Sequence, residues 1–598
     1  MGHSTVPSKP GFGDASSNAA FLLAKGAGRP PAGIAGEVAA AYGGGRLVSS
    51  CTAHPSGYVN LAADWSVLGR EILEESAAPG YGGSPAGAGR QVIVEHTSVN
   101  PNKALHIGHV RNVAVGDSVS RILGKAGYDV RVLNYVDDSG LQVADIVLGF
   151  RLLGIPEEPP DGKKFDHYCG DDVYARATAA YESDPSLEEK RREVLAGMEE
   201  AGSEVARFAS RITGRVLRCQ LQTCWMLGAE YDCLNYESQI VGSGLWGSLF
   251  ERMKGEGLAR LEDGGKNVGC WVVPGPDGED DKVLVRSNGT ATYIAKDIPY
   301  AAWKLGLAGD PFGYAEYGGQ PGTRRLWQTV LGGGGTMPPP SPSRVITVID
   351  SRQARLQGII SGIVEGFGAG PGSYVHLGYE SVALSPGTAR DLGVDTGGKS
   401  AQMSGRKGVY VSADAVHGAL SARISEETRQ RHSGMGDEEV ARIAADVATG
   451  VMRYEMIRQD LDKVIVFDME RSKGLEGDTA PYIQYAHARA VRLLEKAGRE
   501  PPASVDCSRL GAAELDLVRE IGMFGIRVGD AADNLSPKVV ARCCRDLAVL
   551  FNAFYEKTRV LGSGDADLED ARLRIVDSFR RTVSEGLALL GIRSPPVM

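Results

Sequence analysis

The stretch that decides the fold is Val94-Glu95-His96-Thr97-Ser98-Val99-Asn100-Pro101-Asn102-Lys103-Ala104-Leu105-His106-Ile107-Gly108-His109-Val110-Arg111-Asn112. It continues a β-rich run that begins at residue 91, crosses a polar loop and enters an amphipathic helix, and residues 130–135 then predict a second strand. A strand, a helix and a strand in about 45 residues form a βαβ unit, which implies a parallel sheet. Because ligands bind at the carboxyl ends of such strands, the polar loop is expected to line a crevice.

Two histidines mark the start of this helix. His106 and His109 are three residues apart, so their side chains share a face beside the free N–H groups of the helix amino terminus. Helix amino termini favour anions, imidazoles donate hydrogen bonds to phosphate oxygens, and Gly108 lets a nucleotide ring approach the backbone. The pattern predicts a polyphosphate site. A pair of surface histidines is the alternative for this spacing alone, but the position after a strand and a loop that carries Lys103 favours the binding site.

Composition excludes several classes of protein. The chain has 598 residues, of which 42% are hydrophobic and 23% charged, as in a globular protein of several domains rather than a disordered or fibrous one. We expect a cytoplasmic protein without membrane contact, because no run is apolar for long enough to span a bilayer and no signal peptide is recognisable. Nine cysteines without CxxC spacing predict reduced thiols and no metal site. The net charge of −10 excludes a uniformly basic surface but leaves room for a local basic groove.

The chain divides into three predicted domains. Residues 1–85 predict a small α+β domain that ends in a Gly/Pro-rich linker. Residues 90–425 predict a Rossmann-like α/β domain with a helical insertion at about 155–280, and residues 426–598 predict an all-α helical bundle.

Two further expectations concern the middle domain. The strands near residues 283–285 and 345–349 are expected to form the second half of its sheet, beyond the insertion. The segment 308–343 is rich in glycine and proline and predicts a surface loop without stable secondary structure.

The sequence resembles the arginyl-tRNA synthetases, a family of class I aminoacyl-tRNA synthetases, over most of its length. Besides the His106-Ile107-Gly108-His109 signature, four stretches match in the expected order, at residues 10–25, 292–304, 481–490 and 546–555. The resemblance implies a two-step ligase. L-arginine reacts with ATP to give arginyl-adenylate, and the arginyl group then moves to the 2′-hydroxyl of the 3′-terminal adenosine of tRNA(Arg).

The same resemblance implies the partners. ATP arrives with Mg²⁺ as substrate and counter-ion, no tightly bound cofactor is expected, tRNA is required for efficient activation, and the protein is expected to be a monomer. Two other hypotheses stay open from the residues alone: a different nucleotidyltransferase of the same signature, and an RNA-binding relative that has lost catalysis.

The arginine pocket is predicted around residues 293–297. Tyr293 and Asp297 are four residues apart, so on a helix both share a face, where a carboxylate and a phenol suit a guanidinium. Glu95 at a strand end would supply a second carboxylate. The plain alternatives are a solvated carboxylate for Asp297 and a core aromatic for Tyr293. By the resemblance, Asn100 holds the α-amino or carboxylate group of arginine and Gln353 belongs to the pocket wall.

A second class I signature, similar to KMSKS, is expected after the last sheet strand. The segment Gln402-Met403-Ser404-Gly405-Arg406-Lys407-Gly408 lies there, with glutamine and glycine in place of the two lysines. Because the leaving pyrophosphate still needs a cation, Lys103 is assigned that role beside His106 and His109. ATP binding is assigned to His106, Gly108, His109, Met403, Ser404, Arg406 and Lys407, with the choice between the last two open and a basic surface turn as the alternative.

Contacts with tRNA are predicted at both ends of the chain. Asn18 lies in the matched amino-terminal stretch, although a helix cap explains it equally well. Tyr485 and Tyr555 can stack on unpaired bases. Arg545 belongs to residues 538–559, which contain five basic residues and two acidic ones and could therefore position phosphates. A solvated helix face explains that charge equally well. The stretch 137–142 lies at the end of the second predicted strand. It could border the ATP ribose, arginine or the tRNA terminus, and the sequence does not decide among these three ligands.

Overall fold

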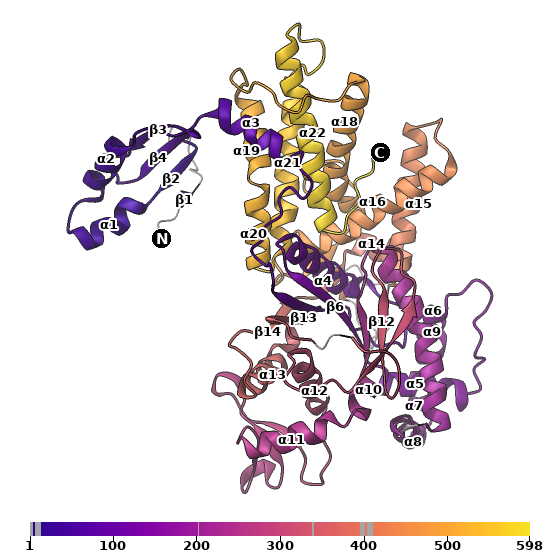
Figure 1. Cartoon of the computed structure of the whole chain (residues 1–598). Coiled ribbons are helices and arrows are strands. Elements are labelled where there is room, and N and C mark those ends of the chain that lie inside the picture. Colours follow the sequence, from indigo (N-terminus) through magenta and orange to yellow (C-terminus); the bar gives the residue numbers. More distant parts are fainter. Residues whose placement is uncertain (1–3, 6–12, 201, 338–339, 395–400, 403–410) are drawn as a thin grey trace.

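The computed structural model describes residues 4–5, 13–200, 202–337, 340–394, 401–402 and 411–598. An amino-terminal domain stands apart on one side, a central sheet lies under helix α4, and a helical bundle rises above the sheet (Figure 1). The class of fold predicted from the sequence is therefore confirmed: a Rossmann-like domain with a small α+β domain before it and helices after it.

The amino-terminal domain is a four-stranded antiparallel sheet with two helices. The sheet order is β1-β2-β4-β3. Left-handed Gly28, with φ of 62°, ends the first helix, and the prolines at 30 and 31 begin the second. The elements are β1 (Ser4–Thr5), β2 (Ala15–Ser17), α1 (Ala19–Ala27), α2 (Pro31–Ala41), β3 (Val48–Ala53) and β4 (Val59–Ala63).

Helix α3 (Trp65–Glu75) packs on the bundle, against α19 and α22, whereas the sequence assigns it to the first domain. The buried hydroxyl of Ser76 donates to Ser578 at 2.7 Å, and Arg574 donates to the carbonyl of Leu73 at 2.8 Å. The small domain is thus tied to the bundle through the helix that follows it.

The central sheet has seven strands in the order β11-β12-β7-β6-β5-β13-β14, all parallel to their neighbours except β11. The strand order reverses beside β5, which places a crevice at the carboxyl ends of β5 and its neighbours. The strands are β5 (Gln91–Glu95), β6 (Asp129–Val136), β7 (Cys233–Tyr236), β11 (Gly313–Gly318), β12 (Leu326–Val330), β13 (Arg344–Asp350) and β14 (Tyr374–Tyr379).

Helix α4 (Ile107–Lys125) is the crossover between β5 and β6 and is almost entirely buried. Gly116 lies against His96, where a Cβ atom would come within 2.3 Å of the histidine side chain. Two fully buried arginines hold α4 in place. Arg453 from α16 donates to Asp117 at 2.6 Å, and Arg111 from α4 donates to carbonyl oxygens of the neighbouring loops.

Two predictions for the middle domain are wrong. The range 155–280 contains β7, a strand of the main sheet, and the strand at 283–285 belongs to a separate sheet of order β10-β9-β8. The helical part of the insertion ends with α9 (Glu204–Met226). The strand after it was missed because β7 is short and its polar Asn235 interrupts the apolar run.

The segment 308–343 is not a featureless loop, since it contains β11 and β12 of the main sheet. Its glycines serve close backbone approach: a Cβ on Gly313 would lie 1.7 Å from the carbonyl oxygen of Gly333. Buried Tyr314, Leu326 and Thr329 anchor the two strands. The glycine content that suggested a loop is what lets these backbones meet.

The remaining elements of the middle domain follow. They are α5 (Leu141–Arg151), α6 (Phe165–Tyr168), a π-helix (Cys169–Tyr174), α7 (Ala175–Ser183), α8 (Leu187–Glu199), α9 (Glu204–Met226), α10 (Glu237–Gly242), α11 (Leu245–Gly255), β8 (Arg260–Leu261), β9 (Trp271–Val273), β10 (Lys282–Val285), α12 (Ile294–Lys304), α13 (Ala354–Gly366) and α14 (Pro386–Asp391), with 3₁₀ turns at Gly265–Asn267, Pro276–Gly278 and Ser351–Gln353.

The carboxy-terminal part is helical, but it is not all-α. Strand β17 (Ile465–Phe467) pairs with β15 (Val382–Leu384), which also pairs with β16 (Ala401–Gln402). The strand is too short to show a period in the sequence. The helices are α15 (Ala413–Arg431), α16 (Asp437–Ile457), α17 (Met469–Ser472), α18 (Ala480–Ala497), α19 (Ala512–Gly522), α20 (Phe524–Asp533), α21 (Pro537–Lys557) and α22 (Ala566–Leu589).

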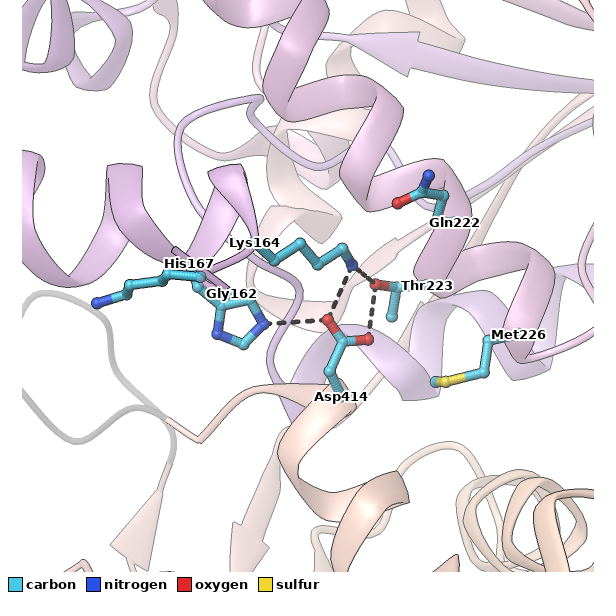
Figure 2. Close-up of a pocket in the computed structure, with 8 residues that line it drawn as sticks. Gly162, Lys164, His167, Gln222, Thr223, Met226 and Asp414 are labelled. Atoms are coloured by element: carbon cyan, nitrogen blue, oxygen red, sulfur yellow. Dashed lines mark hydrogen bonds and ion pairs between the residues drawn. The ribbon is translucent and has the colours of Figure 1, made fainter. Parts of the chain in front are cut away.

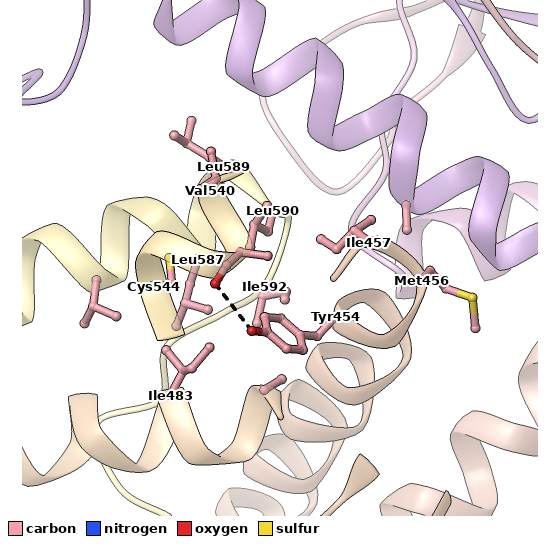
Figure 3. Close-up of a cluster of buried hydrophobic side chains, with 14 of the residues drawn as sticks. Tyr454, Met456, Ile457, Ile483, Val540, Cys544, Leu587, Leu589, Leu590 and Ile592 are labelled. Atoms are coloured by element: carbon pink, nitrogen blue, oxygen red, sulfur yellow. Dashed lines mark hydrogen bonds between the residues drawn. The ribbon is translucent and has the colours of Figure 1, made fainter. Parts of the chain in front are cut away.

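The bundle core joins helices that are distant in sequence. Figure 3 shows Tyr454 of α16 and Ile483 of α18 among side chains from α21 and α22, such as Cys544 and Leu587. All nine cysteines of the chain are free thiols. None of the helices in the described ranges is both long enough and apolar enough to cross a membrane.

We predict that Arg453→Met lowers the free energy of unfolding by about 3 kcal/mol, because Asp117 loses a buried cation and the carbonyls of Leu227 and Leu590 lose their donor. Thermal and denaturant unfolding measure the change. The control is Arg429→Met, at an exposed ion pair with Asp437. Equal stability of the two variants would contradict a role for Arg453 in holding α4.

Candidate functional site

The amino terminus of α4 presents two neutral imidazoles. His106 occupies the position before the helix, its ring stacks on that of His109 with centroids 3.5 Å apart, and its backbone N–H donates to Nδ1 of His109 at 3.2 Å. Burial and the nearby Lys103 ammonium lower the pKa of His106 to about 4, and burial also holds the pKa of His109 well below its ordinary value. Both rings are therefore neutral at pH 7, and they can offer hydrogen bonds but no charge.

The segment after the second predicted signature is paired with the first signature. The N–H of Ile107 donates to the carbonyl of Val411 at 3.1 Å, the N–H of Ala413 donates to that of Leu105 at 2.7 Å, and His106 and Ser412 form an antiparallel bridge. Of the predicted ATP-binding residues, Met403, Ser404, Arg406 and Lys407 lie outside the described residues.

Lys103 is held three residues before His106. Its carbonyl accepts a hydrogen bond from Gln220 of α9 at 2.7 Å, and its ammonium lies 5.4 Å from the centre of the Tyr174 ring. A Cβ on Gly170 would lie 2.7 Å from the Cβ of Lys103, so the π-helix needs a glycine there. The structure thus brings together Lys103, His106, Gly108 and His109, as predicted from the sequence.

Three carboxyl groups gather at the carboxyl edge of β5, β6 and β7. They are Asp297 on α12, Asp137 after β6 and Glu237 at the start of α10. Burial and the charge of Glu237 raise the pKa of Asp297 to about 7, with a smaller effect from Glu95, and burial and Glu237 raise that of Asp137 to about 7. Such a cluster of carboxyl groups favours a cationic ligand, because a cation relieves their mutual repulsion.

The neighbours of this acidic cluster fix its geometry. Asn100 donates to Asp137 at 2.6 Å, and Glu237 accepts from Tyr135 at 2.7 Å and from Lys296 at 3.0 Å. Asn100 therefore lies in the predicted pocket. Glu237 was not found from the sequence because it follows the missed strand β7, and the stretch that contains Asp137 was noted without an assigned ligand.

Glu95 and Tyr293 differ from the simple expectation. Glu95 is buried and forms an ion pair with Lys304, which is 1% exposed. Its negative charge is therefore already balanced by a cation of the protein. Tyr293 is 58% exposed at the start of α12, where its hydroxyl lies 3.3 Å from the ammonium of Lys282. It borders a cavity of about 1,040 Å³ that Lys296 also lines.

Gln353 lies on the exposed 3₁₀ turn after β13. Among the described residues, no hydrogen bond or ion pair joins it to the acidic cluster. The role of Gln353 in the pocket wall stays a prediction.

A cluster missed from the sequence lies beside the two paired signatures. Figure 2 shows Lys164, His167 and Thr223 converging on the carboxylate of Asp414, at 2.9, 3.0 and 2.8 Å, next to a cavity of about 480 Å³. The adjacent carbonyl of Asp166 accepts from the N–H of Ala104 at 3.1 Å. Asp414 is the second residue of α15, so the cluster fixes the start of that helix against the loop that carries Lys103.

The predicted RNA contacts fall on three surfaces. Asn18 precedes α1 but makes no side-chain cap bond. Tyr485 and Tyr555 lie on either side of Arg489, whose guanidinium carbon is 4.6 and 5.3 Å from the two ring centres. Arg545 lines a separate cavity. Arg489 itself was not singled out in the sequence.

The comparisons with known proteins identify the class first. Residues 78–306 match the model of the class I tRNA synthetase (R) catalytic domain, a class that uses ATP, and residues 483–598 match the DALR anticodon binding domain. Residues 4–63 match the arginyl tRNA synthetase N terminal domain.

Relatives then give the family. The arginine–tRNA ligase of Thermus thermophilus is 36% identical, with 97% of this chain and 93% of that protein covered. The enzyme of the same name from Deinococcus radiodurans is 34% identical, with coverages of 99% and 95%. The solved arginyl-tRNA synthetase of Thermus thermophilus superposes with a TM-score of 0.84 at 33% identity, over 100% of this chain and 96% of that one. The chain belongs to the arginyl-tRNA synthetase family.

We predict that the cluster at Asp414 stabilises the protein most at low pH. The hydrogen bond to Asp414 raises the folded-state pKa of His167 above its ordinary value near 6.5. The stabilisation is therefore fully present below pH 6.5 and is lost as the pH rises through the higher, folded-state value.

Melting temperatures between pH 5.5 and 8.5 test this. His167→Gln should cost less than about 1 kcal/mol at pH 6, and the cost should shrink as the pH rises. His54→Gln, in the amino-terminal domain, is the control. A cost that is constant or grows with pH would contradict the assignment.

Proposed function

We propose that this member of the arginyl-tRNA synthetase family activates L-arginine with ATP and transfers it to the 3′-terminal adenosine of tRNA(Arg), using the residues around the amino terminus of α4. The observation that carries the proposal is that the amino terminus of α4, with Lys103 and two neutral imidazoles, lies at the same edge of the domain as a cluster of three carboxyl groups. The first suits a nucleotide and the second suits a guanidinium.

In the first step, the carboxylate of arginine attacks the α-phosphate of ATP, and pyrophosphate leaves. His106 and His109 hydrogen-bond the phosphates, Gly108 gives the nucleotide access to the backbone, and Lys103 stabilises the negative charge that develops on pyrophosphate. Mg²⁺ enters as the counter-ion of ATP. Met403, Ser404, Arg406 and Lys407 are proposed to complete the ATP site.

Arginine is placed by its two ends. The guanidinium is proposed to bind Asp297, with Asp137 and Glu237 nearby and Tyr293 at the mouth. Asn100, which donates to Asp137, is proposed to meet the α-amino or carboxylate group. Glu95 is proposed to act through its pair with Lys304, and Gln353 remains a proposal from the resemblance alone.

In the second step, the terminal ribose 2′-hydroxyl of tRNA attacks the carbonyl carbon of arginyl-adenylate. An ester bond to the ribose forms, the bond between the acyl group and the phosphate breaks, and AMP leaves as the hydroxyl proton is released. Asn18, Tyr485, Arg545 and Tyr555 are proposed to contact the RNA elsewhere, with Arg489 between the two tyrosines. We expect a monomer in the cytoplasm. The nine free thiols support a reducing compartment, and the family resemblance supports the monomer.

We predict that Asp297→Asn lowers kcat/KM for arginine by roughly 30- to 1,000-fold, the equivalent of about 2–4 kcal/mol, with little change in KM for ATP. Wild-type KM for arginine should fall about tenfold from pH 6 to pH 8, because the carboxyl groups ionise near pH 7 and only the ionised form attracts the guanidinium.

The measurement is aminoacylation of total tRNA with labelled arginine, with Asp437→Asn at an exposed carboxylate as control. The pH dependence of KM should be weaker in Asp297→Asn. If the wild type charges tRNA with another amino acid, or if both variants behave alike, the arginine pocket is misplaced.

We also predict that Lys103→Met lowers kcat for arginine activation by about 10²- to 10³-fold and leaves KM for arginine within a few-fold. The cation acts on charge that appears only in the transition state, so ground-state binding changes little. Pyrophosphate exchange in the presence of tRNA measures both values. Lys190→Met, at an exposed pair with Glu193 on α8, is the matched control. A rise in KM without loss of kcat would overturn the role of Lys103.

A further inference from the structure

The ammonium group of Lys103 meets an aromatic ring from a separate element. Its nitrogen lies 5.4 Å from the centre of the Tyr174 ring. At this distance the face of an aromatic ring attracts a cation. A ring holds an ammonium group without cancelling its charge, whereas a carboxylate at the same place would neutralise it. A ring can therefore fix the position of the ammonium and leave its charge for a phosphate.

The Tyr174 ring is itself held by the packing of the insertion. Tyr174 is the last residue of the π-helix Cys169–Tyr174, and it packs against a buried cluster that includes Phe150 and Val173. Val173 lies so close to α5 that a Cβ atom on Gly149 would come within 2.6 Å of its side chain. π-helices are rare and occur frequently at functional sites, so a π-helix at this contact is informative.

The same element touches the loop of Lys103 at two further points. The N–H of Ala104 donates to the carbonyl oxygen of Asp166 at 3.1 Å. A Cβ atom on Gly170 would lie 2.7 Å from the Cβ of Lys103, so the stem of the lysine rests against the backbone of the π-helix. The backbone beside Lys103, its stem and its ammonium group therefore each meet one continuous stretch, residues 165–174.

This stretch is also tied to the segment that pairs with the first signature. His167 lies 3.0 Å from the carboxylate of Asp414, the second residue of α15 (Figure 2). Ser412, directly before α15, forms an antiparallel bridge with His106. The stretch that meets Lys103 is thus joined to the start of α4 by a second route, besides the loop itself.

We propose that Tyr174 is a positioning residue for arginine activation, which holds the ammonium group of Lys103 at the place where pyrophosphate leaves, while Gly170 gives room for the lysine stem. The inference rests on the proposed role of Lys103 and adds to it a residue outside both signatures. Tyr174 acts only through Lys103, and this is what an experiment can separate from a general role in folding.

The test is pyrophosphate exchange by the full-length protein with arginine, ATP and tRNA. Tyr174→Leu should lower kcat about tenfold and leave KM for arginine within about twofold, because Lys103 acts on charge that appears only in the transition state. Tyr174→Phe keeps the ring and should stay within about twofold of the wild-type kcat. Gly170→Ala pushes on the lysine stem from the same element and should also lower kcat.

A double variant gives the readout that a structural role would not produce. Lys103→Met/Tyr174→Leu should be no slower than Lys103→Met alone, because the ammonium through which Tyr174 acts is already absent. If Tyr174 served only the packing of the insertion, its replacement would slow the wild type and Lys103→Met by the same factor.

The matched control is Tyr181→Leu on the next helix, α7, where the ring lies 5.3 Å from the guanidinium carbon of Arg191. Its kcat should equal that of the wild type, and thermal melting checks that each variant folds. If Tyr174→Leu does not fold, Gly170→Ala decides by the same comparison, alone and with Lys103→Met.

Three results would each overturn the inference: an unchanged kcat in Tyr174→Leu, an equal loss in Tyr174→Phe, or a further loss when Tyr174→Leu is added to Lys103→Met. Exchange by the wild type is measured in parallel. Its absence with arginine would reject the proposed function itself, whereas normal exchange by both the wild type and Tyr174→Leu rejects only the role of Tyr174.

Discussion

Two backbone hydrogen bonds hold the site together, between Leu105–Ile107 at the start of α4 and Val411–Ala413 before α15. These segments are about 300 residues apart in sequence, and their pairing joins the chain just after the second signature to the start of α4. The Asp414 cluster reinforces the pairing from one side. Arg111 and Arg453 join α4 to the loops and helices that follow the sheet.

The site depends on a division of charge across a short distance. At the helix terminus the imidazoles are neutral, and Lys103 is the cation proposed to act on phosphate. At the strand edge Asp297, Asp137 and Glu237 crowd together, so burial and repulsion raise the pKa values of both aspartates to about 7. In the proposed mechanism, arginine binds between the two, with its carboxylate toward the nucleotide.

Much of this arrangement could be predicted from the sequence. The βαβ unit and the His106/His109 pair follow from periodicity and spacing, whereas the spacing of Tyr293 and Asp297 places them on one face only if the segment is helical. The strands β7, β11 and β12 could not be predicted, because β7 is too short to show a period and glycines needed for close backbone contact disguise the other two. Glu237 was missed together with β7.

Other features depend on tertiary structure alone. Lys304, which neutralises Glu95, lies on the same matched helix as Asp297, but only the packed structure shows that it points inward. The contacts of Asp414 on α15 with His167 of α6 and Thr223 of α9 are visible only in the folded structure. Likewise, only the folded structure brings Tyr174 to Lys103.

A structure of the protein with a non-hydrolysable arginyl-adenylate analogue tests the central claim most directly. The account predicts the guanidinium within hydrogen-bond distance of Asp297, and the phosphate beside His106, His109 and the amino terminus of α4. A guanidinium bound away from the cluster of Asp297, Asp137 and Glu237, or a phosphate away from α4, would contradict it.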